Sequence, residues 1–160
     1  MVAALGCRDR LEKYLREHDA TYEVQQHREA YTAQEIAAAE HVSGSKFAKV
    51  VMVVAEGEPA MLVLPAPRKV DLARAGDLVG QGDLRLAQER EFQASFPDCE
   101  PGAMPPFGNL YGVPVFVDES LTHEETIYFQ AGSHEETMSV PYEDFARLVQ
   151  PTVGDFANGS

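Results

Sequence analysis

The residues of this sequence best suited to chemistry are a glycine- and proline-rich segment, one lysine and one histidine. The segment runs from Gly102 through Ala103, Met104, Pro105, Pro106 and Phe107 to Gly108. Each of its two prolines holds φ at about −65° and lacks an amide hydrogen, so the segment can form neither a helix nor an inner strand. A loop that is shaped before anything binds loses little entropy on binding, which suits recognition. A proline-rich crossover between two sheet elements is the alternative.

Lys49 is the only charged residue between Lys46 and Glu56, and it stands at the start of an apolar run. That run, residues 48–55, is rich in β-branched side chains and predicts a buried strand. An ammonium group that faces a pocket from such a strand could neutralise a phosphate or stabilise an oxyanion. A lysine at this position could equally extend its ammonium group to solvent. The sequence leaves both interpretations open.

Two histidines have positions compatible with a pocket. His134 follows Gly132 and Ser133, soon after a predicted strand. Beside a pocket it could hold a water molecule or a ribose hydroxyl, whereas in an open turn it is simply solvated. His27 ends a predicted edge strand ahead of a helix start, a position that suits a pocket rim or plain capping. Position alone does not separate these alternatives.

A repeated pattern of a histidine and two glutamates, at His123 and at His134, suggests a metal site at first sight. If the strands between them form a hairpin that turns near Gly132, the two imidazoles lie about seven residues apart along the ladder, or roughly 23 Å. No single ion reaches both. We therefore expect no metal and no other cofactor.

Covalent catalysis is also disfavoured. Cys7 and Cys99 lie far apart in the sequence and match neither a CxxC nor a zinc spacing, so we expect two reduced thiols. The thiolate of Cys99 would be disfavoured by Asp98 and Glu100 on either side. The sequence contains no GxSxG, Walker A or HExxH motif. An enzyme with this sequence would position a water molecule and an ester with backbone groups, one lysine and a histidine.

The charge of the chain limits its partners. Its 26 acidic and 13 basic residues give a net charge of −13, which argues against a general nucleic-acid-binding protein and against DNA. All lysines and arginines except Arg147 lie at or before Arg90. A polyanion must therefore dock on the N-terminal half, where a few contacts could hold a small acceptor end but not a long duplex. The basic residues expected there are Lys46, Lys49, Arg68 and Lys69.

At 160 residues the chain most simply forms one domain, residues 1–160, with a hydrophobic core of its own. No apolar run approaches the roughly 20 residues that span a bilayer, so we expect no membrane partner. The first residues become charged too early for a signal peptide. The expected location is therefore the cytoplasm.

Periodicity and turn residues predict a mixed α+β domain rather than a doubly wound sheet. Helices are expected over residues 8–18, 33–40 (after an N-cap at Thr32), 70–80, 88–95 and 142–149. Strands are expected over residues 21–26, 48–55, 60–64, 84–87, 113–117, 126–129 and 137–140, the second and third forming a hairpin. Residues 154–160 are expected to fray.

Six short motifs occur in order along the chain. They are Tyr22-Glu-Val with His27 and Thr32, Ala48-Lys49-Val-Val, the segment 102–108, Gly112-Val-Pro-Val with Val117-Asp118, Ala131-Gly132-Ser-His134, and Asp144-Phe-Ala-Arg-Leu148. This set resembles the YbaK family, the prolyl-tRNA synthetase-associated editing domain and its free-standing relatives. The likeness covers about residues 11–151, and the order and spacing of the motifs make it specific.

The resemblance implies a single compact α+β domain in which helices surround a mixed, twisted, barrel-like sheet. It also implies trans-editing, the hydrolysis of the ester that joins a wrong amino acid to tRNA. In the family the lysine of the second motif lines the pocket and contacts the terminal nucleotide of the tRNA, which gives that role to Lys49. The family's Gly-x-x-x-Pro loop corresponds to Gly102–Pro106, whose backbone amides would hold the aminoacyl carbonyl. Its Gly-x-His turn corresponds to His134.

The resemblance therefore predicts a site without a covalent nucleophile, in which Lys49, Gly102 and His134 are catalytic. The substrate would contact His27, Ala103, Met104, Pro105, Pro106, Phe107, Gly132 and Ser133, and the tRNA would contact Lys46, Arg68 and Lys69. The partner would be the 3′ acceptor end of a mischarged tRNA that carries alanine, serine, cysteine or another small amino acid. Participation of an aminoacyl-tRNA synthetase is left open. A non-catalytic ligand- or aminoacyl-tRNA-binding module, for example a regulatory domain, is the alternative that suits the acidic surface.

Overall fold

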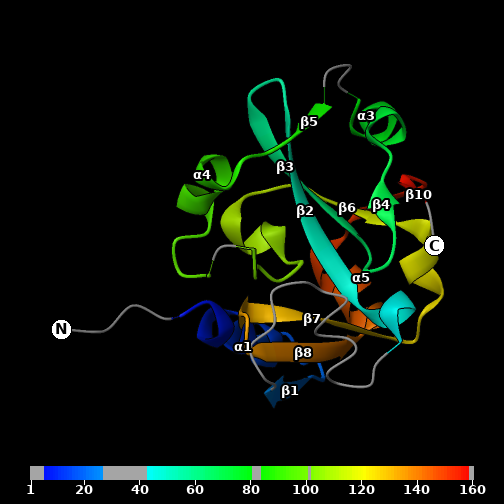
Figure 1. Ribbon diagram of the computed structural model, residues 1–160. Helices are drawn as coiled ribbons and strands as arrows, with labels where there is room; N and C mark the ends of the chain where they lie inside the picture. Colours follow the sequence, from blue (N-terminus) through cyan, green and yellow to red (C-terminus); the bar gives the residue numbers. More distant parts are fainter. Residues whose placement is uncertain (1–5, 27–42, 81–83, 101, 159–160) are drawn as a thin grey trace.

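The computed structural model of the chain describes residues 6–26, 43–80, 84–100 and 102–158 (Figure 1). Two predictions, the helix over 33–40 with its cap at Thr32 and the position of His27, lie outside these residues. Within them the fold is α+β, with a mixed sheet and surrounding helices, as the sequence predicted.

A five-stranded mixed sheet forms the centre of the fold. The hairpin predicted from residues 48–55 and 60–64 lies in this sheet, and Lys49 pairs with Leu64 across it. The hairpin turn has positive φ at Glu56 (50°) and Gly57 (81°), the backbone that a tight turn between twisted strands requires. The strand over Val115–Asp118 runs parallel to both of its neighbours. In spatial order the strands are β5 (Leu84–Leu86), β2 (Ala48–Ala55), β3 (Glu58–Pro65), β6 (Val115–Asp118) and β9 (Thr152–Gly154).

A three-stranded antiparallel sheet lies across the first sheet (Figure 1). Its spatial order is β1 (Glu23–Gln26), β8 (Glu136–Pro141) and β7 (Thr126–Ser133), so the predicted edge strand is at an edge. An isolated parallel β-bridge between Phe47 and Tyr128 joins the residue before β2 to this second sheet. The other two strands within the described residues, β4 (Lys69–Val70) and β10 (Ala157–Asn158), pair with each other.

The helices begin and end at recognisable signals. The first helix buries Leu11 and Leu15, the i and i+4 positions of its apolar face. The next begins after Asp71, whose carboxylate accepts a hydrogen bond from the amide of Arg74, and it ends at Gly80 in the left-handed region. None of the described helices is long and apolar enough to cross a membrane. The described helices are α1 (Cys7–Glu17), α3 (Leu72–Val79), α4 (Glu89–Phe92) and α5 (Tyr142–Val149), with 3₁₀ turns at Gly44–Lys46, Gln93–Ser95, Gly108–Tyr111 and Glu119–His123.

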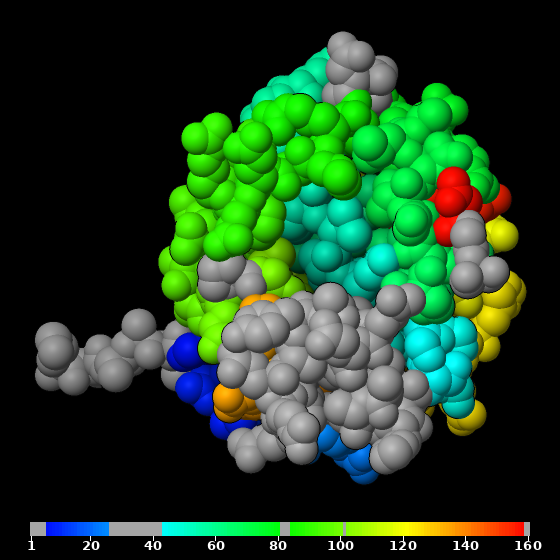
Figure 2. All heavy atoms as spheres, in the orientation of Figure 1, coloured from blue at the N-terminus to red at the C-terminus, as the bar shows by residue number. Residues whose placement is uncertain are grey.

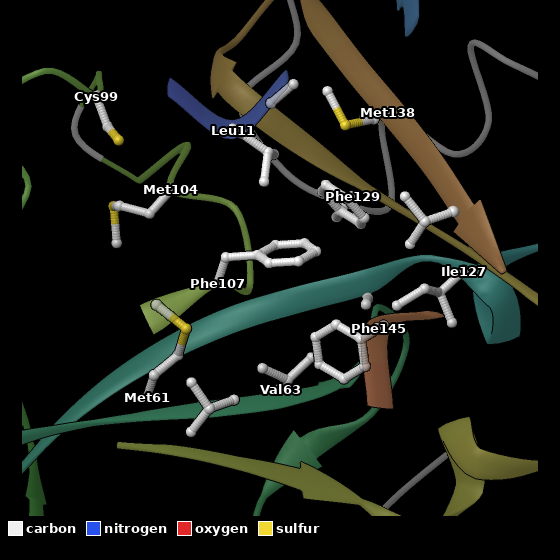
Figure 3. Packing of buried hydrophobic residues seen from close by; sticks show 14 of the residues in the cluster. Leu11, Met61, Val63, Cys99, Met104, Phe107, Ile127, Phe129, Met138 and Phe145 are labelled. Atoms are coloured by element: carbon white, nitrogen blue, oxygen red, sulfur yellow. The ribbon is translucent and has the colours of Figure 1, made fainter. Parts of the chain in front are cut away.

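The central sheet separates two hydrophobic clusters. Side chains alternate along β2, so Met52 faces one cluster and Val53 faces the other. The larger cluster lies between the two sheets and includes Phe107, whose ring centroid is 5.5 Å from that of Phe129 (Figure 3). The smaller cluster lies under α3 and includes Phe156.

The prediction that residues 154–160 fray is wrong for the part of this segment that the structure describes. β10 pairs with β4, and Phe156 is fully buried. The buried carboxylate of Asp118 holds the segment in place, because it accepts hydrogen bonds from the amides of Phe156 and Ala157, each at 3.0 Å. These partners are remote in the sequence, so no local pattern announces them.

The prediction of two reduced thiols is also wrong. Cys7 and Cys99 form a disulfide, with Cα atoms 5.0 Å apart at a sequence separation of 92 residues. The fold brings the start of α1 against the segment 97–100, where the amide of Cys7 donates to the carbonyl of Asp98 at 3.1 Å. Spacing rules for cysteines cannot detect a pair formed by tertiary structure over such a separation.

Candidate functional site

The glycine–proline loop and the turn that carries His134 form one hydrogen-bonded unit, called here the loop–turn unit (residues 100–107 and 131–134, without 101). The amide of Glu100 donates to the carbonyl of Gly132, and the amide of Gly132 donates to the carbonyl of Ala103, both at 2.9 Å. The amide of His134 donates to the carboxylate of Glu100 at 3.0 Å. Gly102 has a φ of 80°, and a Cβ atom there would lie 3.7 Å from Cε1 of His134. The structure therefore makes the predicted catalytic residues Gly102 and His134 neighbours.

The loop is held by buried side chains. The side chains of Met104 and Phe107 pack into the larger cluster (Figure 3). Both prolines are buried. The prolines have no amide hydrogen, and the amide of Ala103 already donates to the carbonyl of Glu100 at 3.0 Å. Gly102 and Met104 are therefore the residues of the segment 102–106 whose amides make no backbone hydrogen bond to another described residue, and they can be offered to a bound carbonyl group.

Lys49 is half-buried on β2. Burial lowers the pKa of its ammonium group, and the positive charge of Lys69 lowers this pKa further. Because side chains alternate along the strand, Lys49 faces the same side of the sheet as Val51 and Val53, which pack on the smaller cluster. The side chain of Met104, in the glycine–proline loop, packs on the larger cluster.

Basic residues gather where β2 begins. Lys46 ends the 3₁₀ turn before β2, and Lys69 begins β4. Arg68 lies in the turn after β3, where its amide donates to the carbonyl of Pro65 at 3.0 Å. Figure 2 shows a hollow in the molecular surface, with the teal segments of β2 and β3 at its floor and the green segments around α3 and α4 along its upper rim. The cations gathered where β2 begins suit an anionic ligand.

The structure thus divides the predicted site residues into two groups. The contacts above join Gly102, Ala103, His134 and Gly132 in the loop–turn unit, and they place Lys49 beside Lys69. His27, predicted for the pocket rim, lies outside the described residues. Glu100, which holds both Gly132 and His134, was not among the predicted residues. The one feature that marks it in the sequence is a carboxylate two positions before Gly102.

The structure agrees with the separation expected for the two histidine motifs. His134 lies in the turn between β7 and β8, whereas His123 ends a 3₁₀ turn before β7, at the other end of the hairpin. Among the described residues, ligand atoms close enough for a metal ion, within 4.8 Å of one another, occur at Cys7, Asp98 and Cys99. The two sulfur atoms of that group are bonded to each other.

Comparison with known proteins identifies the family. The model of the aminoacyl-tRNA editing domain matches residues 27–148. The chain belongs to this family. The match contains Lys49, the glycine–proline loop and His134, so the three predicted catalytic positions all lie inside the editing domain.

Solved structures share the YbaK-like fold of this editing domain. A candidate trans-editing enzyme for prolyl tRNA synthetase has a TM-score of 0.82 at 22% identity, covering 98% of this chain and 100% of that one. A hypothetical protein, APE2540, has a TM-score of 0.84 at 19% identity, covering 92% and 99%. A candidate signal transduction protein from Marinobacter aquaeolei VT8 has a TM-score of 0.74 at 18% identity, covering 98% of this chain but 31% of that one.

Proposed function

We propose that this protein is a trans-editing hydrolase that cleaves the ester between a small amino acid and the 3′ end of a mischarged tRNA. The observation that carries the proposal is the editing-domain match, which spans both Lys49 and the loop–turn unit. The fold shared with a candidate trans-editing enzyme supports action on a tRNA that was charged elsewhere.

The loop–turn unit would stabilise the transition state of ester hydrolysis. The amides of Gly102 and Met104 donate to the carbonyl oxygen as negative charge develops on it. The water oxygen bonds to the carbonyl carbon, the bond to the ribose oxygen breaks, and the ribose oxygen takes up a proton. His134, beside Gly102, hydrogen-bonds the attacking water or the neighbouring ribose hydroxyl. The buried loop side chains keep these donors in position before the substrate arrives.

Lys49 would bind the phosphate of the terminal nucleotide. Burial and Lys69 both disfavour its charged form, and a bound anion offsets that cost. Lys46 and Arg68 add charge at the same end of β2. Such a small number of cations suits the acceptor end of a tRNA rather than its whole length, in a chain whose net charge is −13.

The rigid loop would select the amino acid by size. A fixed wall excludes a side chain that is too large far better than it rejects one that is smaller. We expect esters of alanine, serine or cysteine to be cleaved and esters of larger amino acids to be spared.

The proposal is tested by incubating the protein with a panel of aminoacyl-tRNAs. Ala-, Ser- and Cys-tRNA(Pro) are compared with Pro-tRNA(Pro), and release of the labelled amino acid is followed against the spontaneous rate. We expect at least one small mischarged ester to be cleaved well above that rate while the correctly charged tRNA survives. A folded protein that cleaves no ester, with or without a prolyl-tRNA synthetase, contradicts the proposal.

One comparison favours a second function, a non-catalytic ligand-binding module. The same fold occupies 31% of the candidate signal transduction protein from Marinobacter aquaeolei VT8, so it also occurs as part of a longer chain. This function predicts saturable binding of an aminoacylated tRNA end without release of the amino acid. Filter binding and deacylation measured on the same tRNA separate the two functions.

A further inference from the structure

A cavity beside the disulfide shares Glu100, Gly132 and Ser133 with the loop–turn unit, but Lys49, Gly102 and His134 are not among its lining residues. Its volume is about 540 Å³, and the start of α1, the segment 97–100 and the end of β7 line it. Cys7 and Cys99 both belong to the lining, although they are only 4% and 9% exposed. The disulfide therefore borders a space large enough for a small molecule.

The two sulfur atoms have different surroundings. Cys7 is the first residue of α1, an 11-residue helix, where the helix dipole stabilises a thiolate. The sulfur of Cys99 lies 3.8 Å from a carboxylate oxygen of Asp98, and an oxygen of this carboxylate is also within 4.8 Å of the Cys7 sulfur. Glu100 follows Cys99 in the sequence, so a thiolate is disfavoured more at Cys99 than at Cys7. Exchange is faster when the departing sulfur forms the more stable thiolate. An incoming thiol therefore attacks Cys99, the more exposed of the pair, and Cys7 departs.

We infer that this cavity is a thiol–disulfide exchange site, which admits small cationic or neutral thiols and releases the covalent tether between α1 and the loop–turn unit. In the first step, the thiolate of the small molecule bonds to the sulfur of Cys99. The bond between the cysteines breaks, and Cys7 leaves as a thiolate that takes up a proton. In the second step, another small thiolate bonds to the sulfur of the first, and Cys99 leaves. Two small thiols become one disulfide as the protein disulfide becomes two thiols.

The charge of the cavity determines which thiols enter. Its lining contains one guanidinium group, that of Arg8, and four carboxylates, those of Asp9, Asp98, Glu100 and Glu136. Arg10 pairs with Asp98 at 2.9 Å from outside the lining, and with it counted the carboxylates still exceed the guanidinium groups by two. An anionic thiol is therefore repelled and a cationic thiol attracted, and salt weakens both effects.

The tether acts directly on the loop–turn unit. Cys99 precedes Glu100, whose amide holds Gly132 and whose carboxylate holds the amide of His134. A Cβ atom at Gly132 would lie 2.6 Å from Cβ and 2.7 Å from Sγ of Cys7, so the disulfide packs directly against this backbone. When the bond opens, the sulfur atoms must separate to non-bonded distance within this tight packing. The hydrogen bonds of Glu100 therefore loosen in the reduced protein.

The test exposes the native full-length chain to three thiols of similar size and different charge. These are cysteamine (cationic), 2-mercaptoethanol (neutral) and 2-mercaptoethanesulfonate (anionic). Opening is followed by alkylation and intact mass, and each rate is divided by the rate at which the same thiol opens hydroxyethyl disulfide. We expect the order cationic, neutral, anionic, with at least about a threefold difference between the extremes at low salt and less at about 0.5 M NaCl. Equal normalised rates, or opening only after unfolding, overturn the inference.

Two further measurements locate the effect. Asp9→Asn should lower the ratio of the cationic to the anionic rate, whereas Asp77→Asn, the same charge change on α3, should leave that ratio as it is. Peptide mapping of the first mixed disulfide should find the small thiol on Cys99. A first adduct on Cys7 overturns the assigned direction of attack.

Coupling to the loop–turn unit is measured by amide hydrogen exchange, which does not involve tRNA. The amides of Glu100, Gly132 and His134 should exchange at least about tenfold faster in the reduced protein, through local opening that low concentrations of urea do not accelerate. Amides of the β2–β3 hairpin should change only as far as the global free energy of unfolding changes. Unchanged exchange at these three amides overturns the tether. Because neither readout depends on deacylation, failure here is distinguishable from failure of the proposed function.

Discussion

Lys49 is the residue on which the proposed chemistry depends most directly. Lys49→Met keeps the length and the apolar stem of the side chain and removes its charge. We expect kcat/KM for deacylation to fall about 100-fold or more, because a cation placed against developing or bound negative charge contributes several kcal/mol. Lys46→Met makes the same change in net charge on the exposed 3₁₀ turn and should cost less than about fivefold. Equal losses in the two variants would assign the effect to net charge alone.

The lowered pKa of Lys49 has its own signature in stability. Folding disfavours the charged form, so the unfolded state binds this proton more tightly than the folded state. Wild-type stability therefore rises as the pH passes from the lowered folded pKa to the ordinary value of 10.5. Lys49→Met lacks this rise. The free energy of unfolding of the variant minus that of the wild type should therefore decrease by up to about 1 kcal/mol between pH 7 and pH 10. Urea denaturation across this pH range measures the change; a constant difference contradicts it.

Gly132 is predicted to tolerate no side chain. Its φ is 101°, and an added Cβ atom would meet Cys7 at 2.6 Å, so Gly132→Ala should lower the free energy of unfolding by about 3 kcal/mol or more. Gly57→Ala is the matched control, because its φ is 81° but nothing lies within 4 Å of the added atom. It should lose only about 1 kcal/mol. Equal losses, measured by urea denaturation, would show that backbone strain alone acts at Gly132.

At this scale the sequence identifies residues by type and motif but not by contact. Lys49, Gly102 and His134 stand in short motifs, so they can be named before the fold is known. The hydrogen bonds of Glu100 and the contact between Gly132 and Cys7 form only because the segment 97–103 lies beside the end of β7. The residues next to them in the sequence do not predict these contacts.

At the scale of elements, Asp118 joins the end of β6 to the C-terminal strand pair. Burial raises the pKa of its carboxyl, but hydrogen bonds from Ser120 and from the amides of Phe156 and Ala157 lower it overall. A lowered folded pKa means that the stabilisation is present above the ordinary value of 3.8 and is lost as the pH falls through the folded value. Asp118→Asn should therefore cost about 2–3 kcal/mol near pH 7 and much less near pH 2. Denaturant titrations at the two pH values measure this, and an equal loss at both contradicts it.

Elements with local signals are predictable, and elements made by distant pairing are not. The β2–β3 hairpin has alternating apolar strands around a Glu-Gly turn, and α3 has Asp71 and Gly80 at its ends, so both are found from sequence. β10 is two residues long, and its partner is β4. Nothing in the segment 154–160 itself indicates that pairing.

For the whole molecule, the disulfide is expected to be a major source of stability. It joins residues separated by 92 positions, and closure of a loop of that size stabilises a fold by about 4 kcal/mol in the chain-entropy view. Reduction should lower the free energy of unfolding by about this amount. The double variant Cys7→Ser/Cys99→Ser should show the lower stability with or without reductant. Urea curves that do not respond to reductant in the wild type would contradict the prediction.

The overall architecture was accessible from the sequence, whereas the relative placement of the site residues was not. The order of the motifs already indicated the editing family and its α+β fold, which the family match and the solved structures confirm. The side of the sheet that Lys49 faces, which it shares with Val51 and Val53, depends on the register of β2. Strand register is set when the two sheets pack together, so the periodicity of a single segment does not predict it.

The most direct test of the central claim is the single-turnover rate of amino acid release from Ala-, Ser- and Cys-tRNA(Pro) by the wild type and by Lys49→Met. Circular dichroism melts confirm that both proteins are folded. We predict that the wild type cleaves at least one of these esters and that the variant cleaves it about 100-fold more slowly or worse. A variant that cleaves at the wild-type rate would contradict the role of Lys49. A folded wild type that cleaves none of the three esters would contradict the proposed deacylase function.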